Sequence, residues 1–148
     1  MAAGLTVAQE NLTAFAERFE AVAGTHPDEL FIPRGRVDME LDLKLVSADL
    51  LEALKQLEPY GIGNPLPTFA ARGIKVLLQR QFGKDNRHLQ LLMDGHMPGV
   101  FWRGGACLPQ PWRNGKPMDV VFQVGWDDFR GTPALTVKDV GPVNTLLS

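Results

Sequence analysis

One stretch, Leu57-Glu58-Pro59-Tyr60-Gly61-Ile62-Gly63-Asn64-Pro65-Leu66-Pro67, separates a helical sequence pattern from a long β pattern. Its prolines fix φ and remove backbone donors, whereas its glycines permit left-handed φ values and leave bare N–H groups. Two interpretations stay open: a helix-to-strand connector anchored by Tyr60, or a binding loop that a phosphate or a neighbouring domain approaches. The candidate residues of this loop are Tyr60, Gly61, Gly63, Asn64 and Pro65.

After residue 67 the apolar side chains recur with period two, which is typical of strands. Five groups show this pattern: Ile74, Val76 and Leu78; Leu89, Leu91 and Met93; Val100 and Trp102; Val120, Phe122, Val124 and Trp126; Leu135 and Val137. Turn-rich segments separate the groups and no helical pattern lies between them. A small closed barrel is predicted, because closure removes the exposed edges of an open five-stranded sheet. The oligonucleotide-binding (OB) barrel is the best match.

Before the loop, the sequence predicts two helices and a connecting strand. The first helix is expected over about residues 7–23, with Thr6 as N-cap, Gln9 as its capping-box partner and Gly24 at its end. Strict alternation over residues 37–43 predicts a one-sided strand, and Ser47 is expected to cap a helix that runs to about residue 57. The predicted fold class is therefore mainly β with a helical N-terminal segment (α+β).

Charge is distributed unevenly along the 148 residues. Residues 1–67 carry 5 Lys/Arg against 11 Asp/Glu, a net charge of −6, and residues 68–148 carry 10 against 6, a net charge of +4. The basic part suits a polyanion on one face, although a modest patch of this kind also occurs on an ordinary solvated surface. Binding by this chain alone is expected to be weak.

Catalytic, metal and membrane functions find little support in the sequence. A single cysteine, Cys107, cannot form an internal disulfide, and the three histidines show no zinc-ligand spacing. No apolar run approaches the ~20 residues of a membrane span, and no secretion signal is recognisable. We therefore expect a cytoplasmic chain with no metal site and no membrane partner. The acidic pair Asp127-Asp128 is expected to shape a hairpin turn.

Four segments in order carry a resemblance to a known family. They are residues 1–7 leading into a helix, residues 57–69, residues 83–89 entering a strand, and Val137-Lys138-Asp139-Val140. Together they resemble the C-terminal part of RecJ-type single-strand-specific DNA exonucleases of the DHH/DHHA1 phosphoesterase superfamily, with Tyr60 where the family often has Phe. The resemblance implies that the chain begins just after a Gly-Gly-His motif of the DHHA1 domain.

The resemblance also implies where the chemistry lies. Members of the family hydrolyse phosphodiesters from a 5′ end with two divalent cations, Mn²⁺ or Mg²⁺, held by Asp and His residues of the DHH domain. Those motifs are not in this sequence, so we expect a non-catalytic fragment without a cofactor of its own. It would contribute single-stranded DNA binding to repair and recombination, beside the DHH and DHHA1 domains of the parent chain.

Strand binding requires cations for phosphates and flat rings for bases. The candidate cations are Lys75, Arg80, Lys84, Arg87, Arg103 and Arg113, with Lys116 beside the longest loop. The candidate rings are Phe82, His88, Phe101 and Trp112, whereas Trp102 and Trp126 are in phase with apolar neighbours and are expected in the core. A structural role stays open for each ring, since His88 can simply begin a strand and Trp112 can pin the long loop.

A second function class stays open as well. The acidic first half, the small net charge and the apolar helical stripes also suit a scaffold module that packs against the nuclease core or docks a replication or repair protein.

The predicted domains are a DHHA1 remnant over residues 1–30, a connecting strand and helix over 31–67, and the OB domain over 68–148.

Overall fold

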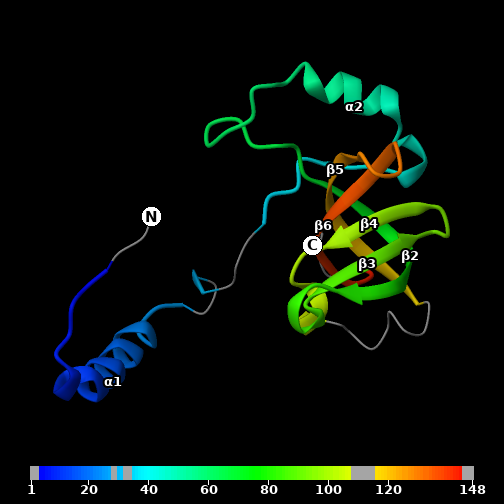
Figure 1. Ribbon diagram of the computed structural model, residues 1–148. Coiled ribbons are helices and arrows are strands. Elements are labelled where there is room, and N and C mark those ends of the chain that lie inside the picture. Colours follow the sequence, from blue (N-terminus) through cyan, green and yellow to red (C-terminus); the bar gives the residue numbers. More distant parts are fainter. Residues whose placement is uncertain (1–3, 28–29, 32–34, 108–115, 145–148) are drawn as a thin grey trace. The chain divides into compact units, whose positions relative to one another are not determined.

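The computed structural model describes residues 4–27, 30–31, 35–107 and 116–144 (Figure 1). Two compact units make up the chain, Met1–Gly35 and Arg36–Ser148. Among the described residues, no helix has the length and apolar character that crossing a bilayer requires.

The first unit contains the 3₁₀ turn η1 (Gln9–Asn11) and helix α1 (Leu12–Ala23), which ends at Gly24 as expected. The predicted Thr6 cap is wrong: Ala8 is extended, so the first turn begins at Gln9, and Asn11 precedes α1 without a side-chain cap. Thr6 therefore lies too far ahead to reach the free N–H groups of the first turn. The apolar stripe of α1 is exposed in this unit and consists of Leu12, Phe15, Phe19 and Val22.

The second unit starts with a short strand, β1 (Met39–Glu40), parallel to the first barrel strand. The predicted seven-residue strand is wrong, because Asp42 accepts a 2.9 Å hydrogen bond from the Lys44 N–H and starts the 3₁₀ turn η3 (Leu43–Leu45). Helix α2 (Ala48–Lys55) follows, and Ser47 caps it as predicted by accepting from the Leu50 N–H at 3.2 Å. Three leucines of α2, Leu50, Leu51 and Leu54, pack on the core beneath it.

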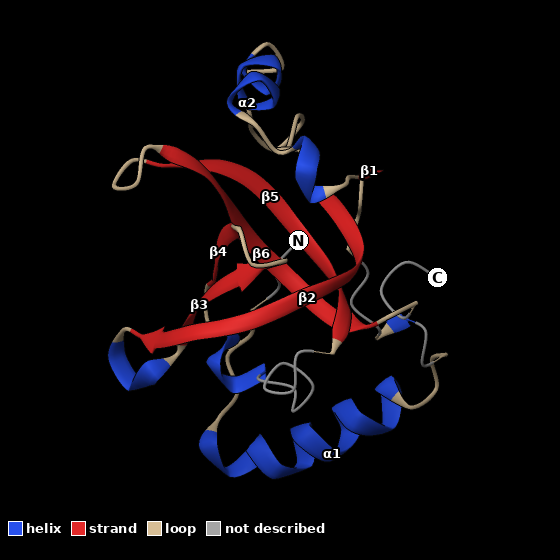
Figure 2. Ribbon diagram, turned by 90° about the vertical axis from the view of Figure 1, so that its right-hand side faces the viewer, coloured by secondary structure: helices blue, strands red, loops and turns tan. Residues whose placement is uncertain are grey.

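Five strands then close a barrel, which confirms the predicted fold class. They are β2 (Phe69–Phe82), β3 (His88–Met93), β4 (Met97–Phe101), β5 (Pro117–Asp127) and β6 (Thr132–Pro142). The sheet order is β1-β2-β3-β4-β6-β5, and the pairing of β2 with β5 closes it. Figure 2 shows the long strand β2 crossing the barrel and pairing at both ends.

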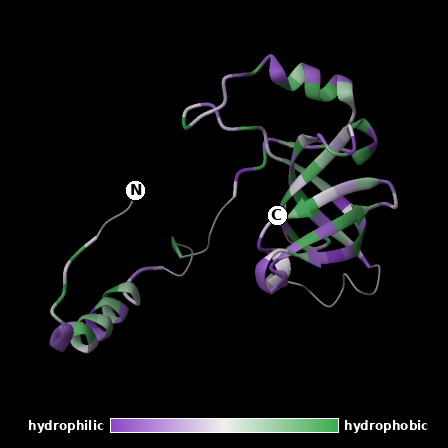
Figure 3. Ribbon diagram, in the orientation of Figure 1, coloured by the Kyte–Doolittle hydropathy of each residue, from purple (hydrophilic) through white to green (hydrophobic). Residues whose placement is uncertain are grey.

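The core lies inside this barrel and follows from the alternation of the strands. Figure 3 shows that the barrel strands carry both hydrophobic and hydrophilic residues. Leu89, Leu91 and Met93 of β3 are fully buried and meet Val76 of β2 and Phe122 of β5. Each such side chain contributes roughly 1.5 to 3 kcal/mol when removed from water. Because one side chain in two points inward, the same strands place a second row of residues on the outer face.

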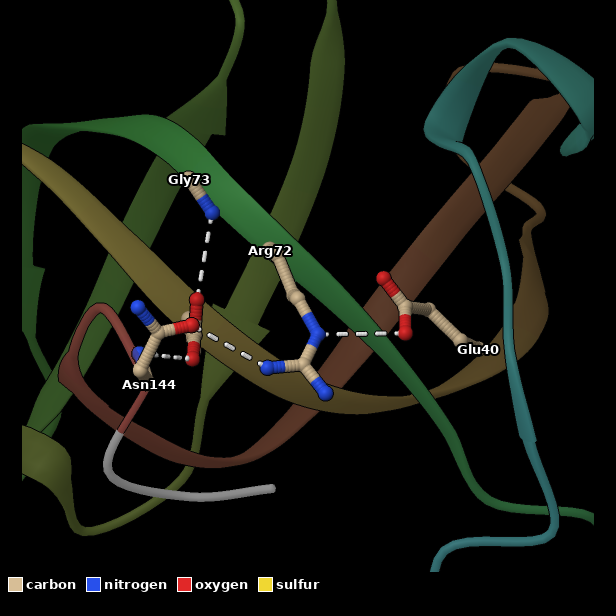
Figure 4. A network of polar contacts seen from close by, with 5 residues as sticks. Glu40, Arg72, Gly73 and Asn144 are labelled. Carbon is tan, nitrogen blue, oxygen red and sulfur yellow. Dashed lines mark hydrogen bonds and ion pairs between the residues drawn. The ribbon is translucent and has the colours of Figure 1, made fainter. Parts of the chain in front are cut away.

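A polar network fixes the end of β6 to the start of the barrel (Figure 4). The fully buried carboxylate of Asp119 accepts hydrogen bonds from the Gly73 N–H at 3.1 Å and from the Asn144 N–H at 2.8 Å. Arg72 donates to Glu40 at 3.1 Å and to the Asn144 side chain at 3.2 Å. The network thus joins β1, β2, β5 and the residues after β6.

Candidate nucleic-acid interface

The outer face of β2, β3 and β4 carries two cross-strand rows. Phe82 pairs with His88 in one row, and Arg80 pairs with Gln90, which pairs with Val100, in the next. Leu89 and Leu91 point into the core, so His88 and Gln90 point outward. The two rows place aromatic, cationic and amide side chains on one surface of the barrel.

Three rings gather at the end of this surface and form what we call the ring cluster: Phe82, His88 and Trp102. The centroids of Phe82 and His88 lie 5.4 Å apart, those of Phe82 and Trp102 5.8 Å, and those of His88 and Trp102 5.0 Å. The Arg80 guanidinium lies 5.7 Å from the centroid of Phe82, within cation–π distance. Trp102 keeps 54% of its surface exposed. The cluster therefore offers an accessible aromatic surface beside a cation.

Two loops hold the ring cluster in place. The Arg103 N–H donates a 3.0 Å hydrogen bond to His88 Nδ1, so a neutral His88 carries its proton on Nε2. Gly83 has a φ of 79°, and a Cβ there would lie 2.4 Å from His88 Cδ2. The His88 ring therefore occupies the space that a side chain at position 83 would need. The Gly105 N–H donates to the Arg87 carbonyl at 2.9 Å. These contacts bind the loop after β2 to the segment after β4.

A groove of about 490 Å³ begins beside the ring cluster. It is lined by Gln79, Arg80, Phe82, Gln90, Val100, Asp127, Phe129 and Arg130. A second groove of about 400 Å³ shares Gln79 and Arg130 with the first and has a more apolar lining, which includes Leu92, Met97, Pro98 and Pro133. We call them the first and second grooves.

The β5–β6 hairpin forms the far wall of the first groove. The Asp127 carboxylate accepts from the N–H groups of Phe129 at 3.0 Å and Arg130 at 3.1 Å, and it also pairs with the Arg130 guanidinium at 3.3 Å. Gly131 adopts a φ of 64° and donates to the Asp127 carbonyl at 2.8 Å. The turn is therefore well fixed, yet Phe129 at its tip is 97% exposed.

The candidate cations differ in their partners. Arg87 lies 3.6 Å from the Asp85 carboxylate, and Arg130 is paired with Asp127. Within the part of the chain that the structure describes, the side chains of Arg80, Lys84 and Arg103 have no carboxylate within ion-pair distance. Their charge is available to a bound anion without the loss of an internal pair.

The structure brings some predicted residues together and separates others. Arg80, Phe82 and His88 share the surface with the first groove, and Lys84, Arg87 and Arg103 belong to the loops beside it. Lys75 lies near the other end of β3, where its N–H donates to Asp94 at 2.9 Å. Trp112 and Arg113 lie outside the described residues.

The aromatic assignments need correction. Phe101 is buried in the barrel and is no stacking ring, because its neighbour in register is the inward Leu89. Trp102 and Trp126 are 54% and 49% exposed, so their expected place in the core is wrong. Trp102 follows the last residue of β4 in a turn. Trp126 stays in phase with buried Val124, but it lies one residue from the end of β5, where the burial of that strand ends.

Phe129 and Arg130 are site residues that the sequence analysis missed. Their signal in the sequence is an aromatic and a basic residue inside a tight Asp-to-Gly hairpin turn between the last two strands. In OB barrels the loop at this place flanks the strands that bind oligonucleotides, so the turn places two side chains beside the candidate interface as well as reversing the chain.

The proline-glycine loop is braced internally. Tyr60 donates its hydroxyl hydrogen to the Leu54 carbonyl of α2, and Asn64 Nδ2 donates to the carbonyls of Leu57 at 2.7 Å and Pro59 at 3.1 Å. Gly61 and Asn64 exchange backbone hydrogen bonds of 2.8 and 3.2 Å, and Pro65 directly follows this bridge. Neither Gly61 nor Gly63 adopts a positive φ, and a Cβ on either would meet no atom within 4 Å.

Potential metal ligands stay apart in the described part of the chain. No three His, Cys, Asp or Glu side chains come together there as a set that could hold an ion.

Comparison with known proteins gives one consistent result. The family model described as "RecJ OB domain" matches residues 37–139. The single-stranded-DNA-specific exonuclease RecJ of Haemophilus influenzae is 30% identical over 141 residues, which cover 91% of this chain and 24% of that protein. The same enzyme of Bacillus subtilis is 26% identical over 145 residues, covering 94% and 18%. The chain thus spans about a fifth to a quarter of the length of these relatives.

A solved structure shows the same fold. The crystal structure of RecJ from Thermus thermophilus in complex with Mn²⁺ superposes with a TM-score of 0.68 at 23% identity, covering 97% of this chain and 21% of that one.

Proposed function

The chain belongs to the RecJ OB domain family, and from this premise we propose that its barrel binds single-stranded DNA in the first groove as a non-catalytic module of a RecJ-type exonuclease. The observation that carries the proposal is the ring cluster, in which an exposed Trp102 lies next to Phe82 and His88 and the Arg80 guanidinium lies over Phe82. The groove begins at this cluster.

Physical chemistry supports this choice of ligand. Single strands are held by cations along the phosphates and by aromatic rings on which bases stack, with little sequence preference. The first groove supplies Arg80 and Arg130 for phosphates and Phe82 and Phe129 for bases. Gln90 and Gln79 add amide groups that hydrogen-bond any base edge or phosphate. Strands 2 and 3 of an OB barrel and its first and last loops are the usual binding surface, which here corresponds to β3, β4 and the loops after β2 and β5.

The remaining activity belongs, in this proposal, to the rest of the parent chain. Cleavage of single-stranded DNA from a 5′ end by Mn²⁺ or Mg²⁺ would take place in DHH and DHHA1 domains, with residues 1–30 as the end of the latter and residues 31–67 as the connection. The OB module would hold the strand for that active site during DNA repair and recombination in the cytoplasm. Lys75 stays a predicted contact outside the first groove, and Trp112 and Arg113 stay predicted contacts that fall outside the described residues.

A packing module is the second candidate. The observation in its favour is the apolar stripe of α1, whose Leu12, Phe15, Phe19 and Val22 all remain exposed in the first unit. Such a stripe is typical of a surface that another domain covers. In this alternative the barrel closes the nuclease or docks a repair protein and contacts DNA weakly.

Salt-dependent binding tests the two candidates. Fluorescence anisotropy with a fluorescein-labelled oligothymidine should show binding that weakens steeply from low to moderate salt. In a plot of the logarithm of the binding constant against the logarithm of the salt concentration, Arg80→Ala and Lys84→Ala should each reduce the magnitude of the slope by about 0.7. This is the value for one phosphate contact of a single strand. Lys55→Ala removes the same charge from α2, where Lys55 is paired with Glu52, and should leave the slope unchanged. Absent or salt-independent binding would favour the packing module.

A further inference from the structure

Resting on the proposed function, we propose that the β5–β6 hairpin divides the binding face into two adjacent base subsites and that Arg130 holds the phosphate between them. The first groove takes one base against Phe129 and the ring cluster, and the second groove takes the next.

The hairpin is built to present Phe129. Three hydrogen bonds converge on Asp127, from the Phe129 N–H, the Arg130 N–H and the Arg130 guanidinium. Gly131 supplies the positive φ that closes the turn. A fixed backbone lowers the entropy lost when a ligand binds to the side chain that it carries. Phe129 is nevertheless 97% exposed and lines the first groove, so its free ring is placed for an occupant of that groove.

Two grooves meet at the base of this hairpin. Only Gln79 and Arg130 line both of them among the residues described for the two grooves. These two side chains therefore lie where a chain can pass from one groove to the other. In a single strand, the group between two neighbouring bases is a phosphodiester, and Arg is the side chain best suited to it. Its pairing with Asp127 at 3.3 Å orients the guanidinium at this crossing.

The two grooves differ in chemistry. The first is lined by two rings, Phe82 and Phe129, together with Arg80 and Gln90. The second is lined by the apolar side chains of Leu92, Met97, Pro98 and Pro133 together with His96. The first subsite therefore holds its base by stacking, and the second holds its base by apolar contact. Neither wall has the buried polar groups that select one base, so the pair accepts any sequence.

Equilibrium binding to a fluorescein-labelled oligothymidine tests the inference through two different signatures. Phe129→Ala should weaken binding roughly 5- to 150-fold with an unchanged salt slope, because base stacking involves no counterion release. Phe129→Tyr keeps a ring and should restore binding. Arg130→Gln should lower the steepness of the salt plot by about 0.7. Phe19→Ala on α1 and Lys55→Gln on α2 are the matched controls, and both should bind as the wild type does.

The outcomes separate this inference from the proposed function. If the wild-type chain binds and both Phe129→Ala and Arg130→Gln bind equally well, the two-subsite inference is wrong and the proposed function stands. If Arg130→Gln changes affinity but not the salt slope, Arg130 does not contact the phosphate and the arrangement is wrong. If the wild-type chain fails to bind at low salt, the proposed function itself fails. Circular dichroism melting of each variant verifies that the exposed hairpin substitutions leave the barrel folded.

Discussion

The rings of His88 and Trp102 lie 5.0 Å apart at an interplanar angle of 72°, and they join the first residue of β3 to the turn after β4. The hydrogen bond from the Arg103 N–H to His88 Nδ1 fixes the same two segments, so the indole is held by its neighbours while its own surface stays half exposed. A held but exposed ring is a suitable stacking platform.

Trp102 should therefore report on DNA binding directly. Trp102→Ala should weaken oligothymidine binding by roughly 1 to 3 kcal/mol, the contribution of one stacked base. Trp102→Phe should retain part of the affinity and lose the quenching of intrinsic fluorescence that a stacked base causes. Trp126→Phe changes an exposed indole that does not belong to the ring cluster, so it should keep the quenching. Equal quenching in both Phe variants would contradict the platform.

Gly83 should be intolerant of a side chain. An alanine there must adopt a φ of 79° with a ψ of −179°, a conformation almost exclusive to glycine, which costs roughly 1 to 3 kcal/mol. Its Cβ would also lie 2.4 Å from His88 Cδ2 and displace the ring. We expect Gly83→Ala to lower the free energy of urea unfolding by at least that amount and to weaken DNA binding. Unchanged stability would show that the loop after β2 relaxes freely.

Gly61 and Gly63 should behave in the opposite way. Their φ values are ordinary and a Cβ would meet open space, so alanine fits the folded state while it restricts the unfolded chain. Each of Gly61→Ala and Gly63→Ala is expected to raise the free energy of unfolding by roughly 0.4 to 1 kcal/mol. Urea denaturation beside Gly83→Ala gives the comparison. A loss of stability would mean that the loop needs glycine for the fold itself.

Asp119 should be the most sensitive polar residue of the barrel. Asp119→Ala leaves the N–H groups of Gly73 and Asn144 without their acceptor, at a place that is only part-buried. A donor left without its partner costs roughly 1 to 3 kcal/mol when buried and less where water reaches it, so the unfolding free energy should fall by about 2 kcal/mol. Glu40→Gln breaks only the exposed pair with Arg72 and should cost less than about 1 kcal/mol. Similar losses of unfolding free energy for both variants would show that Asp119 contributes no more to stability than the exposed ion pair between Glu40 and Arg72 does.

Much of the fold could be predicted because its signals are local. Ser47 caps α2 because its hydroxyl meets an N–H three residues ahead, and the alternation of Leu89, Leu91 and Met93 fixes which face of β3 is buried. The seven-residue strand around β1 could not be excluded locally, because the turn that Asp42 starts competes with the alternating pattern. Phe129 could not be assigned to the site, because a turn sequence does not say which groove its tip reaches.

Five alternating strands, a capped helix and the loops that carry the family resemblance follow from the amino-acid sequence alone, since each depends on neighbours along the chain. Which side chains share the candidate interface follows only from the pairing of strands in the folded barrel. Simple alternation would turn Arg80 and Phe82 to the same side as Val76, into the core. A bulge between Leu78 and Arg80 inserts one extra residue, so Arg80 pairs with outward Gln90 and Phe82 with outward His88. A one-residue shift of register exchanges the two faces of a strand. The register is set by pairing with a strand that is distant in the sequence, so the local sequence pattern cannot predict it.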